Sequence, residues 1–174
     1  MLNMLPADGQ SPYLPDILAL YRAAFPANER RPLDALLNDK SGAGEVFAVL
    51  DGDTFIGLVI LLTHGDITHI LYFAVVEALR GRGYGAEILA AIRRRYPKQR
   101  ILADLEAPDE NADNHQQRAR RIDFYLRNGY ARTDIGYTWI GERYVILCAG
   151  GSITGREFGD FWEYFYNLDE GYDY

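Results

Sequence analysis

The stretch Arg80-Gly81-Arg82-Gly83-Tyr84-Gly85 follows an apolar segment that ends at Val76, and it opens a segment with helical periodicity. A helix start presents free backbone N–H groups and the positive end of the helix dipole. Glycines let a phosphate approach that backbone closely, and arginine side chains add charge-assisted hydrogen bonds. The stretch therefore predicts a strand–turn–helix unit that binds a pyrophosphate.

The spacing of apolar residues on either side of this turn predicts the other elements. In chain order their expected bounds are a helix over Pro12–Phe25, a short helix around Leu33, Leu36 and Leu37, strands over Glu45–Leu50, Thr54–Leu62 and Ile67–Val76, a helix from Gly85 to Pro97, a strand over Ile101–Glu106, a helix from Asn114 to Asn128, strands over Tyr130–Ile140 and Tyr144–Ala149, and a helix after Thr154. The first three strands form an antiparallel meander, and the strand–helix–strand passage after them implies one parallel pair. The fold class is a mixed α/β or α+β sheet with helices on its faces.

Length and composition favour a globular protein with one domain over residues 1–174, because 48% of the residues are apolar and 25% are charged. The core covers residues 10–149, and a C-terminal aromatic and acidic helix and tail follow over 150–174. The net charge of −7 argues against a nucleic-acid partner. Residues 80–100 differ, with seven basic residues and one acidic residue. This basic stretch is either a solvated helix face or the site of one anionic ligand.

Three features of the sequence favour a cytoplasmic protein. Cys148 is the single cysteine, which excludes an intramolecular disulfide framework and suits a reducing compartment. No basic residue precedes Arg22, so the charged start of a signal peptide is missing. The apolar stretch Thr54–Val76 is interrupted in its middle by His64-Gly65-Asp66, which favours two strands joined by a turn over a membrane span. We therefore expect no membrane partner.

Two kinds of nucleotide site use such a glycine-rich turn. Gly81-x-Gly83-x-x-Ala86 satisfies a relaxed dinucleotide fingerprint, and Asp104 stands about twenty residues later at a strand end. That fingerprint requires its glycines almost directly after the strand, whereas residues 77–80 intervene here. It also requires repeated strand–helix units, whereas a meander precedes this turn. A dinucleotide enzyme is therefore the weaker interpretation.

The second interpretation comes from a family resemblance. Phe73-Ala74-Val75, a short loop and Arg80-x-x-Gly83-x-Gly85 resemble the acetyl-coenzyme A signature of the GNAT N-acetyltransferase superfamily. A later segment, from Arg120 to Tyr130 with its Asn128-Gly129 pair, resembles a helix and strand start of the same family. The two segments stand in the family's order and at its spacing. The resemblance covers about residues 10–149 and leaves the last 25 residues outside the common pattern.

The resemblance implies the GNAT fold, in which the parallel strands over 67–76 and 101–106 splay and hold the pantetheine arm of acetyl-coenzyme A. The residues implied to bind this co-substrate are Phe73, Ala74, Val75, Arg80, Gly81, Arg82, Gly83, Tyr84 and Gly85. The backbone N–H near Val75 would polarise the thioester carbonyl as an oxyanion donor does. Arg118 departs from the family, because many members carry an asparagine there that contacts the coenzyme.

Proton transfer needs an acid for the leaving thiolate and a base for the attacking amine. By resemblance, Tyr125 is the acid, and a phenol with a pKa near 10 can protonate a thiolate beside it. The alternative is a buried tyrosine that packs with Ile122. His69 stands where some relatives place a general-base glutamate, and an imidazole can take the proton of an ammonium group. The alternative is a polar strand residue that is hydrogen-bonded across the hairpin.

Further carboxylates are candidates for the acceptor site. Glu106 ends a strand and is a candidate base as well as a substrate ligand, while Glu29 and Arg30 lie in a loop that lines the acceptor site in this family. For Glu106 the alternative is a solvated acid at the end of a strand. For Glu29 the alternative is an ion pair with an arginine of the same loop. The aromatic and acidic segment Asp160–Tyr174 has the composition of a site for an organic cation, or of a helix that caps the sheet. No spacing suggests a metal site.

The function we expect is transfer of an acetyl group from acetyl-coenzyme A to a primary amine of a small molecule. The amine attacks directly in a ternary complex, because no nucleophile is placed for a covalent intermediate. Alternatives are a non-catalytic domain that binds and senses acyl-coenzyme A, an acetyltransferase for protein or peptide amines, and the dinucleotide enzyme. A homodimer is left open, as are the identity of the amine and the acyl chain length.

Overall fold

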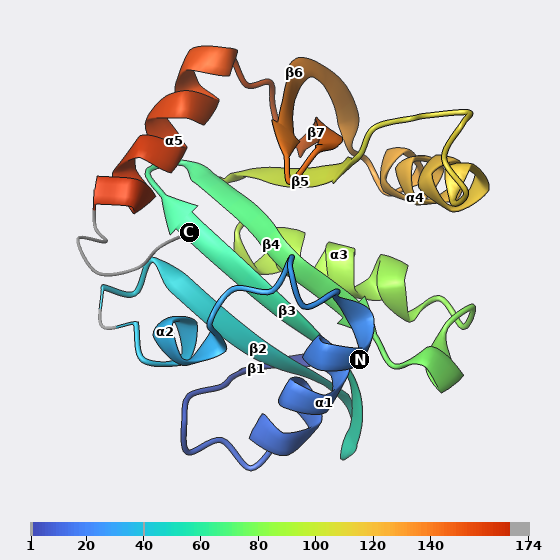
Figure 1. Ribbon diagram of the computed structural model, residues 1–174. Helices are drawn as coiled ribbons and strands as arrows, with labels where there is room; N and C mark the ends of the chain where they lie inside the picture. Colours follow the sequence, from blue (N-terminus) through green and yellow to red (C-terminus); the bar gives the residue numbers. More distant parts are fainter. Residues whose placement is uncertain (1, 40, 168–174) are drawn as a thin grey trace. The chain divides into compact units, whose positions relative to one another are not determined.

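The computed structural model describes residues 2–39 and 41–167 of the chain (Figure 1). The chain divides into two compact units, residues 1–63 with 70–96 and residues 64–69 with 97–174. The boundary crosses strand β4 (Ile67–Val75), so that the start of this strand belongs to the second unit. The single domain expected over residues 1–174 stays a prediction.

The first unit contains an antiparallel sheet. Its strands are β1 (Asn3–Pro6), β2 (Gly44–Asp51), β3 (Thr54–His64) and most of β4, in the order β1-β2-β3-β4. Both β1 and β3 pair antiparallel with β2. At Gly57 of β3, a Cβ atom would lie 2.3 Å from the carbonyl oxygen of Ala74, so any other residue would push β3 and β4 apart. The predicted meander is confirmed.

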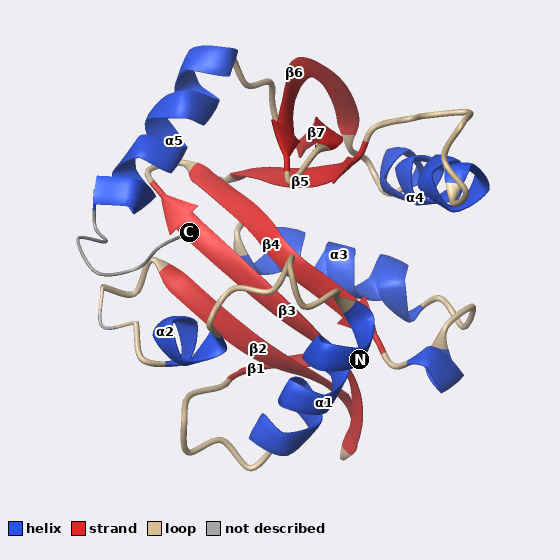
Figure 2. Cartoon of the chain, in the orientation of Figure 1, coloured by secondary structure: helices blue, strands red, loops and turns tan. Residues whose placement is uncertain are grey.

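Helices cover both faces of this sheet (Figure 2). They are α1 (Leu14–Ala24), α2 (Leu33–Leu37), the one-turn 3₁₀ helix η1 (Glu77–Leu79) and α3 (Tyr84–Arg95). Ile17 of α1 and Leu33 of α2 share a buried cluster with Val46 of β2. Side chains alternate between the faces of a strand, so Phe47 points the other way. There the Arg95 guanidinium of α3 lies 4.7 Å from the centre of the Phe47 ring.

Strand β1 was not expected from the sequence. Asn3 pairs with Leu50 and Pro6 with Phe47, which makes β1 the edge of the sheet. Proline cannot donate a ladder hydrogen bond and is tolerated at an edge. A strand of four residues that ends in proline is too short to show alternation, so its pairing depends on the neighbouring β2.

The second unit contains the parallel pair. Its further elements are β5 (Arg100–Glu106), α4 (His115–Arg127), β6 (Ala131–Trp139), β7 (Glu142–Ala149) and α5 (Gly155–Asn167). Strand β7 lies between β5 and β6 and is antiparallel to both. The Arg100 N–H donates to the Asp66 carbonyl oxygen at 2.8 Å, and His69, further along β4, faces Asp104, further along β5. The start of β4 therefore runs parallel to β5, which confirms the mixed sheet.

The spacings Asn114-x-x-Gln117 and Thr154-x-x-Glu157 are those of capping boxes, and the structure contains one of the two. At α5, the Thr154 N–H donates to Glu157 Oε2 at 2.9 Å, and the Glu157 N–H donates to Thr154 Oγ1 at 3.2 Å. At α4, the side chain of Asn114 makes no capping hydrogen bond, so the box with Gln117 was wrong. The Asn114 side chain instead accepts from Arg118 Nε at 2.7 Å, because a buried guanidinium requires a partner.

Candidate active site

The glycine-rich turn of the first unit connects the end of β4 to the start of α3. Gly81 and Gly83 adopt positive φ angles of 76° and 87°, which other residues rarely adopt, and Gly83 is the N-cap of α3. Among the described residues, no heavy atom beyond each glycine and its chain neighbours lies within 4 Å of where a Cβ would stand, so the turn is open on that side. Residues 80–83 are exposed. The first N–H groups of α3 have no partner within the helix and can hold an anion.

Two side chains fasten this turn to the strands of the first unit. Arg80 Nε donates to the carbonyl oxygen of Val75 at 3.1 Å, which ties the turn to the last residue of β4. The Tyr84 hydroxyl donates to Asp51 Oδ2 at 3.0 Å, and this hydrogen bond raises the pKa of Tyr84. Phe73 and Val75 are half-buried, while Ala74 between them is buried in the core of the unit. The structure thus brings all nine predicted coenzyme residues into one continuous strand–turn–helix segment.

Two tyrosines hold the predicted acceptor loop in the first unit. The Tyr72 hydroxyl donates to the Glu29 carbonyl oxygen at 2.7 Å. The Arg31 N–H donates to the hydroxyls of Tyr21 at 2.9 Å and Tyr72 at 3.0 Å. Burial, followed by the bond to Tyr72, raises the pKa of Tyr21. The loop backbone that carries Glu29 and Arg30 is therefore fixed, and both residues are half-buried.

Glu106 of the second unit sits among cationic side chains. Its carboxylate lies 3.1 Å from Arg121 Nη1 and 3.6 Å from Arg118 Nη2, and Asn114 Nδ2 donates to it at 3.3 Å. The sequence suggested a solvated acid or an acceptor ligand here. The structure shows a carboxylate whose charge is already matched by two guanidinium groups.

Arg118 is a buried structural residue in the second unit. Its guanidinium donates to both oxygens of Glu142, at 2.8 and 3.0 Å, and to the Ala107 carbonyl oxygen at 3.2 Å. The hydrogen bond to Glu142 raises the pKa of Arg118, and the same bond lowers the pKa of Glu142. The Arg118 side chain thus joins α4 to β7 and to the end of β5.

Tyr125, the candidate acid, is buried on α4. Its ring makes edge contacts with Phe124, at 5.4 Å between ring centres, and with Tyr130, at 5.1 Å. Burial raises the pKa of Tyr125 most, and the charges of Tyr130 and Asp104 raise it further. The phenol is therefore held in its protonated form.

His69, the candidate base, is fully buried on β4. Its Nε2 atom lies 3.2 Å from Asp104 Oδ1, at ion-pair distance but outside the angles of a hydrogen bond. Helix α5 adds the rings of Phe161 and Trp162, whose centres lie 6.1 and 5.2 Å from the imidazole centre. The sequence did not predict Asp104 in this role, because only the pairing of β4 with β5 places it beside His69.

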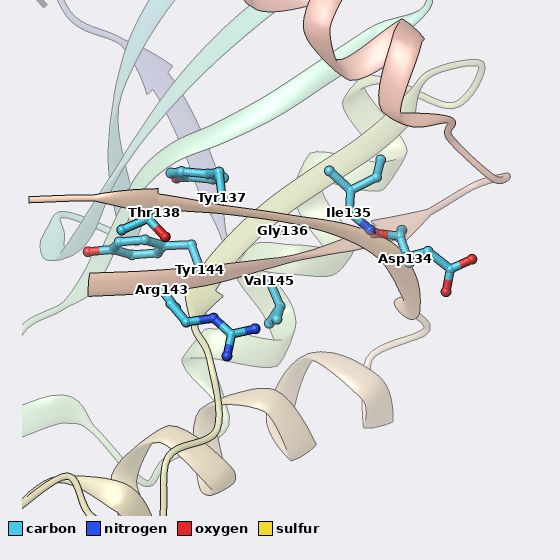
Figure 3. Close-up of a pocket in the computed structure, with 9 residues that line it drawn as sticks. Asp134, Ile135, Gly136, Tyr137, Thr138, Arg143, Tyr144 and Val145 are labelled. Carbon is cyan, nitrogen blue, oxygen red and sulfur yellow. The ribbon is translucent and has the colours of Figure 1, made fainter. Parts of the chain in front are cut away.

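A hairpin of the second unit carries a shallow hollow, lined by residues 133–138 of β6 and 143–145 of β7 (Figure 3). Its two tyrosine rings, Tyr137 and Tyr144, come from facing strands and stack with centres 5.2 Å apart (Figure 3). The Tyr137 hydroxyl also donates to Asp104 Oδ2. The hollow thus includes Tyr137, which holds the carboxylate of Asp104.

Other sequence hypotheses have mixed outcomes. Helix α5 buries Phe161 and Phe165, as expected of a helix that caps a sheet, while residues 168–174, with Asp169 and Glu170, lie outside the described residues. Within residues 2–39 and 41–167, no three His, Cys, Asp or Glu side chains gather as metal ligands. In the same ranges, no helix combines the length and the apolar character that crossing a membrane requires.

Comparison with known proteins identifies the family. The model of the acetyltransferase (GNAT) family matches residues 14–130. The chain belongs to the GNAT acetyltransferase family. This membership confirms the predicted acyltransferase with acetyl-coenzyme A as co-substrate, and it favours that interpretation of the turn over a dinucleotide site. Among curated proteins, none matches the sequence.

Solved structures share the GNAT fold of this acetyltransferase. A GNAT family acetyltransferase from Bacteroides thetaiotaomicron covers 98% of this chain and 99% of its own, with a TM-score of 0.81 and 20% identity. An Elizabethkingia anophelis GNAT acetyltransferase with acetyl-CoA bound covers 85% and 97%, with a TM-score of 0.57 and 16% identity. A spermidine N-acetyltransferase chimera from Vibrio cholerae and hSSAT covers 85% and 94%, with a TM-score of 0.65 and 15% identity. At these identities the likeness shows the fold alone.

Proposed function

We propose that this GNAT acetyltransferase transfers the acetyl group of acetyl-coenzyme A to a primary amine of a small molecule, by direct attack in a ternary complex. The observation that carries the proposal is the turn over Arg80–Gly85, where two left-handed glycines leave the start of α3 open to an anion. In this proposal the first N–H groups of α3 hold the pyrophosphate, with Arg80 and Arg82 beside it. The pantetheine arm runs along the backbone of Phe73, Ala74 and Val75.

The proposed reaction needs two proton transfers. The amine nitrogen attacks the thioester carbon, the carbon–sulfur bond breaks, and the thiolate takes the hydroxyl proton of Tyr125. The raised pKa of Tyr125 supports this role, because it keeps the phenol protonated until a stronger base forms beside it. The proton that the neutral attacking amine loses as the amide forms passes to His69, whose contact with Asp104 favours the imidazolium that forms.

The remaining candidates, Glu29, Arg30 and Glu106, are proposed for the acceptor. Glu29 and Arg30 lie on a loop whose backbone is fixed by Tyr21 and Tyr72, and a fixed loop suits substrate positioning. Glu106 is the weaker candidate for base or ligand, because Arg118 and Arg121 already match its charge. A small-molecule amine is supported by the spermidine N-acetyltransferase among the structures with this fold.

Coenzyme binding is tested by the variant Gly83→Asp. A side chain at this left-handed position strains the turn, and a carboxylate repels the pyrophosphate, so coenzyme A should no longer raise the melting temperature. Gly52→Asp is the matched control, because Gly52 also has a positive φ and open space around it but lies in the β2–β3 turn. It should keep the coenzyme-dependent shift. Normal coenzyme A binding by Gly83→Asp would show that the turn is not the pyrophosphate site.

Catalysis is tested by release of free thiol from acetyl-coenzyme A over a panel of primary amines. Amine-dependent release supports the transferase. Tight coenzyme binding without release on any amine or peptide would favour a domain that senses acyl-coenzyme A. Release with peptides alone would move the acceptor class to protein amines.

A further inference from the structure

The side chain of Asp104 lies at the centre of a cluster that the proposed reaction uses only in part. Its Oδ1 atom lies 3.2 Å from His69 Nε2, and its Oδ2 atom accepts a hydrogen bond from the Tyr137 hydroxyl. The side chain is 19% exposed, and His69 is fully buried. A carboxylate in such surroundings is costly unless charges or hydrogen bonds compensate it, and both of its oxygens are engaged.

We infer that Asp104 is a positioning residue for the proposed base His69, with Tyr137 holding the carboxylate in place. The inference rests on the proposed function, because it concerns the same proton transfers. It assigns to β5 and β6 a part in catalysis that neither the family signature nor the glycine-rich turn contains.

The charge state of Asp104 follows from its surroundings. Burial alone would raise its pKa, but the charge of His69 and the hydrogen bond from Tyr137 together hold the pKa below its ordinary value. Asp104 is therefore an anion at neutral pH. When His69 takes a proton from the amine, the new positive charge forms beside an anion that is already in place.

The surroundings of the pair add little opposing charge. On β6 the group that faces Asp104 is the Tyr137 hydroxyl. Helix α5 faces His69 with the rings of Phe161 and Trp162, which carry no charge. Among the described neighbours of His69, Asp104 is the carboxylate at ion-pair distance.

The test variant is Asp104→Asn, which keeps the shape and an acceptor for Tyr137 but removes the charge. NMR of the unliganded full chain should show that the ring nitrogen resonances of His69 move in this variant, while those of His64 and His115 stay unchanged, because Asp104 is the carboxylate beside His69. The kcat should fall by roughly 10²-fold with an unchanged Kd for coenzyme A, because the variant leaves the glycine-rich turn intact. Asp134→Asn, which makes the same charge change at an exposed site on β6, should alter none of these values.

The outcomes separate this inference from the proposed function. If the wild type is active and the His69 resonances are the same in Asp104→Asn, the Asp104 assignment is overturned, as it is by an unchanged kcat with chemistry rate-limiting. If the His69 resonances move in Asp104→Asn but the wild type acetylates no amine, the proposed function is overturned instead. If Asp104→Asn does not fold, Tyr137→Phe provides the test: kcat should fall roughly five-fold, the size of one lost hydrogen bond. An unchanged kcat in Tyr137→Phe would again reject the inference.

Discussion

At the scale of single residues, Tyr125 is the side chain that we propose as the general acid. It is buried on α4 between aromatic rings, and burial raises its pKa. Tyr125→Phe keeps the ring and removes the proton, so kcat should fall by roughly 10²–10³-fold while coenzyme affinity stays nearly unchanged. Tyr130→Phe is the matched control, because it removes a hydroxyl from the adjacent ring. Steady-state kinetics with chemistry shown to be rate-limiting measure both, and an unchanged kcat in Tyr125→Phe would reject the acid role.

At the scale of elements, the ion-pair network of Arg118 joins α4 to β7 and to the end of β5. Arg118→Met leaves Glu142 and Glu106 without this partner, and breaking a buried pair costs about 3–5 kcal/mol. Both glutamates retain some exposure to water and Arg121 still contacts Glu106, so we expect a loss of about 2–3 kcal/mol in the free energy of unfolding. Urea denaturation measures this loss.

The control for this prediction is Arg120→Met, an exposed position on the same helix, which should change the free energy of unfolding by less than about 0.5 kcal/mol. A second measurement concerns the coenzyme. Because the Arg118 guanidinium is occupied by Glu142, Ala107 and Asn114, the folded Arg118→Met variant should bind coenzyme A with an unchanged Kd. A weakened Kd would mean that arginine here replaces the family's asparagine as a coenzyme ligand.

At the scale of the whole molecule, local patterns predicted more of the fold than of the candidate site. Helical spacing, tight turns and the Thr154–Glu157 box depend on neighbours in the chain, so the main elements, the meander and the parallel pair could be predicted. The position of Asp104 beside His69 depends on the register of β4 against β5, which single-sequence patterns do not encode. The environment of Glu106 likewise depends on how α4 lies against β5, so its two arginine partners could not be predicted.

The distribution of charge over the whole chain predicts the class of acceptor. The net charge is −7 although residues 80–100 hold seven basic residues, so the rest of the chain is strongly acidic. If the basic stretch binds the coenzyme phosphates, the acceptor meets a mainly negative field, and Coulomb attraction favours cationic amines over amines beside a free carboxylate. Polyamines and aminoglycosides should therefore show lower KM values than amino acids. Added salt should raise those KM values, since screening at about 0.15 M acts over roughly 8 Å.

Among the proposed acceptor residues, we expect Glu29 to attract a cationic amine more strongly than Glu106, because two arginines already match the charge of Glu106. Glu29→Gln should raise the KM for a polyamine and reduce its dependence on salt, with little change in the KM for a neutral amine, because only the charge differs. Arg30→Gln is the opposing control: it removes a positive charge next to Glu29, so it should lower the KM for the polyamine. The measurement is the KM of the wild type, Glu29→Gln and Arg30→Gln for a polyamine, an aminoglycoside and an amino acid, each at two salt concentrations. A preference of the wild type for free amino acids, lost in Arg30→Gln, would show that the arginines of this loop select the acceptor by its carboxylate.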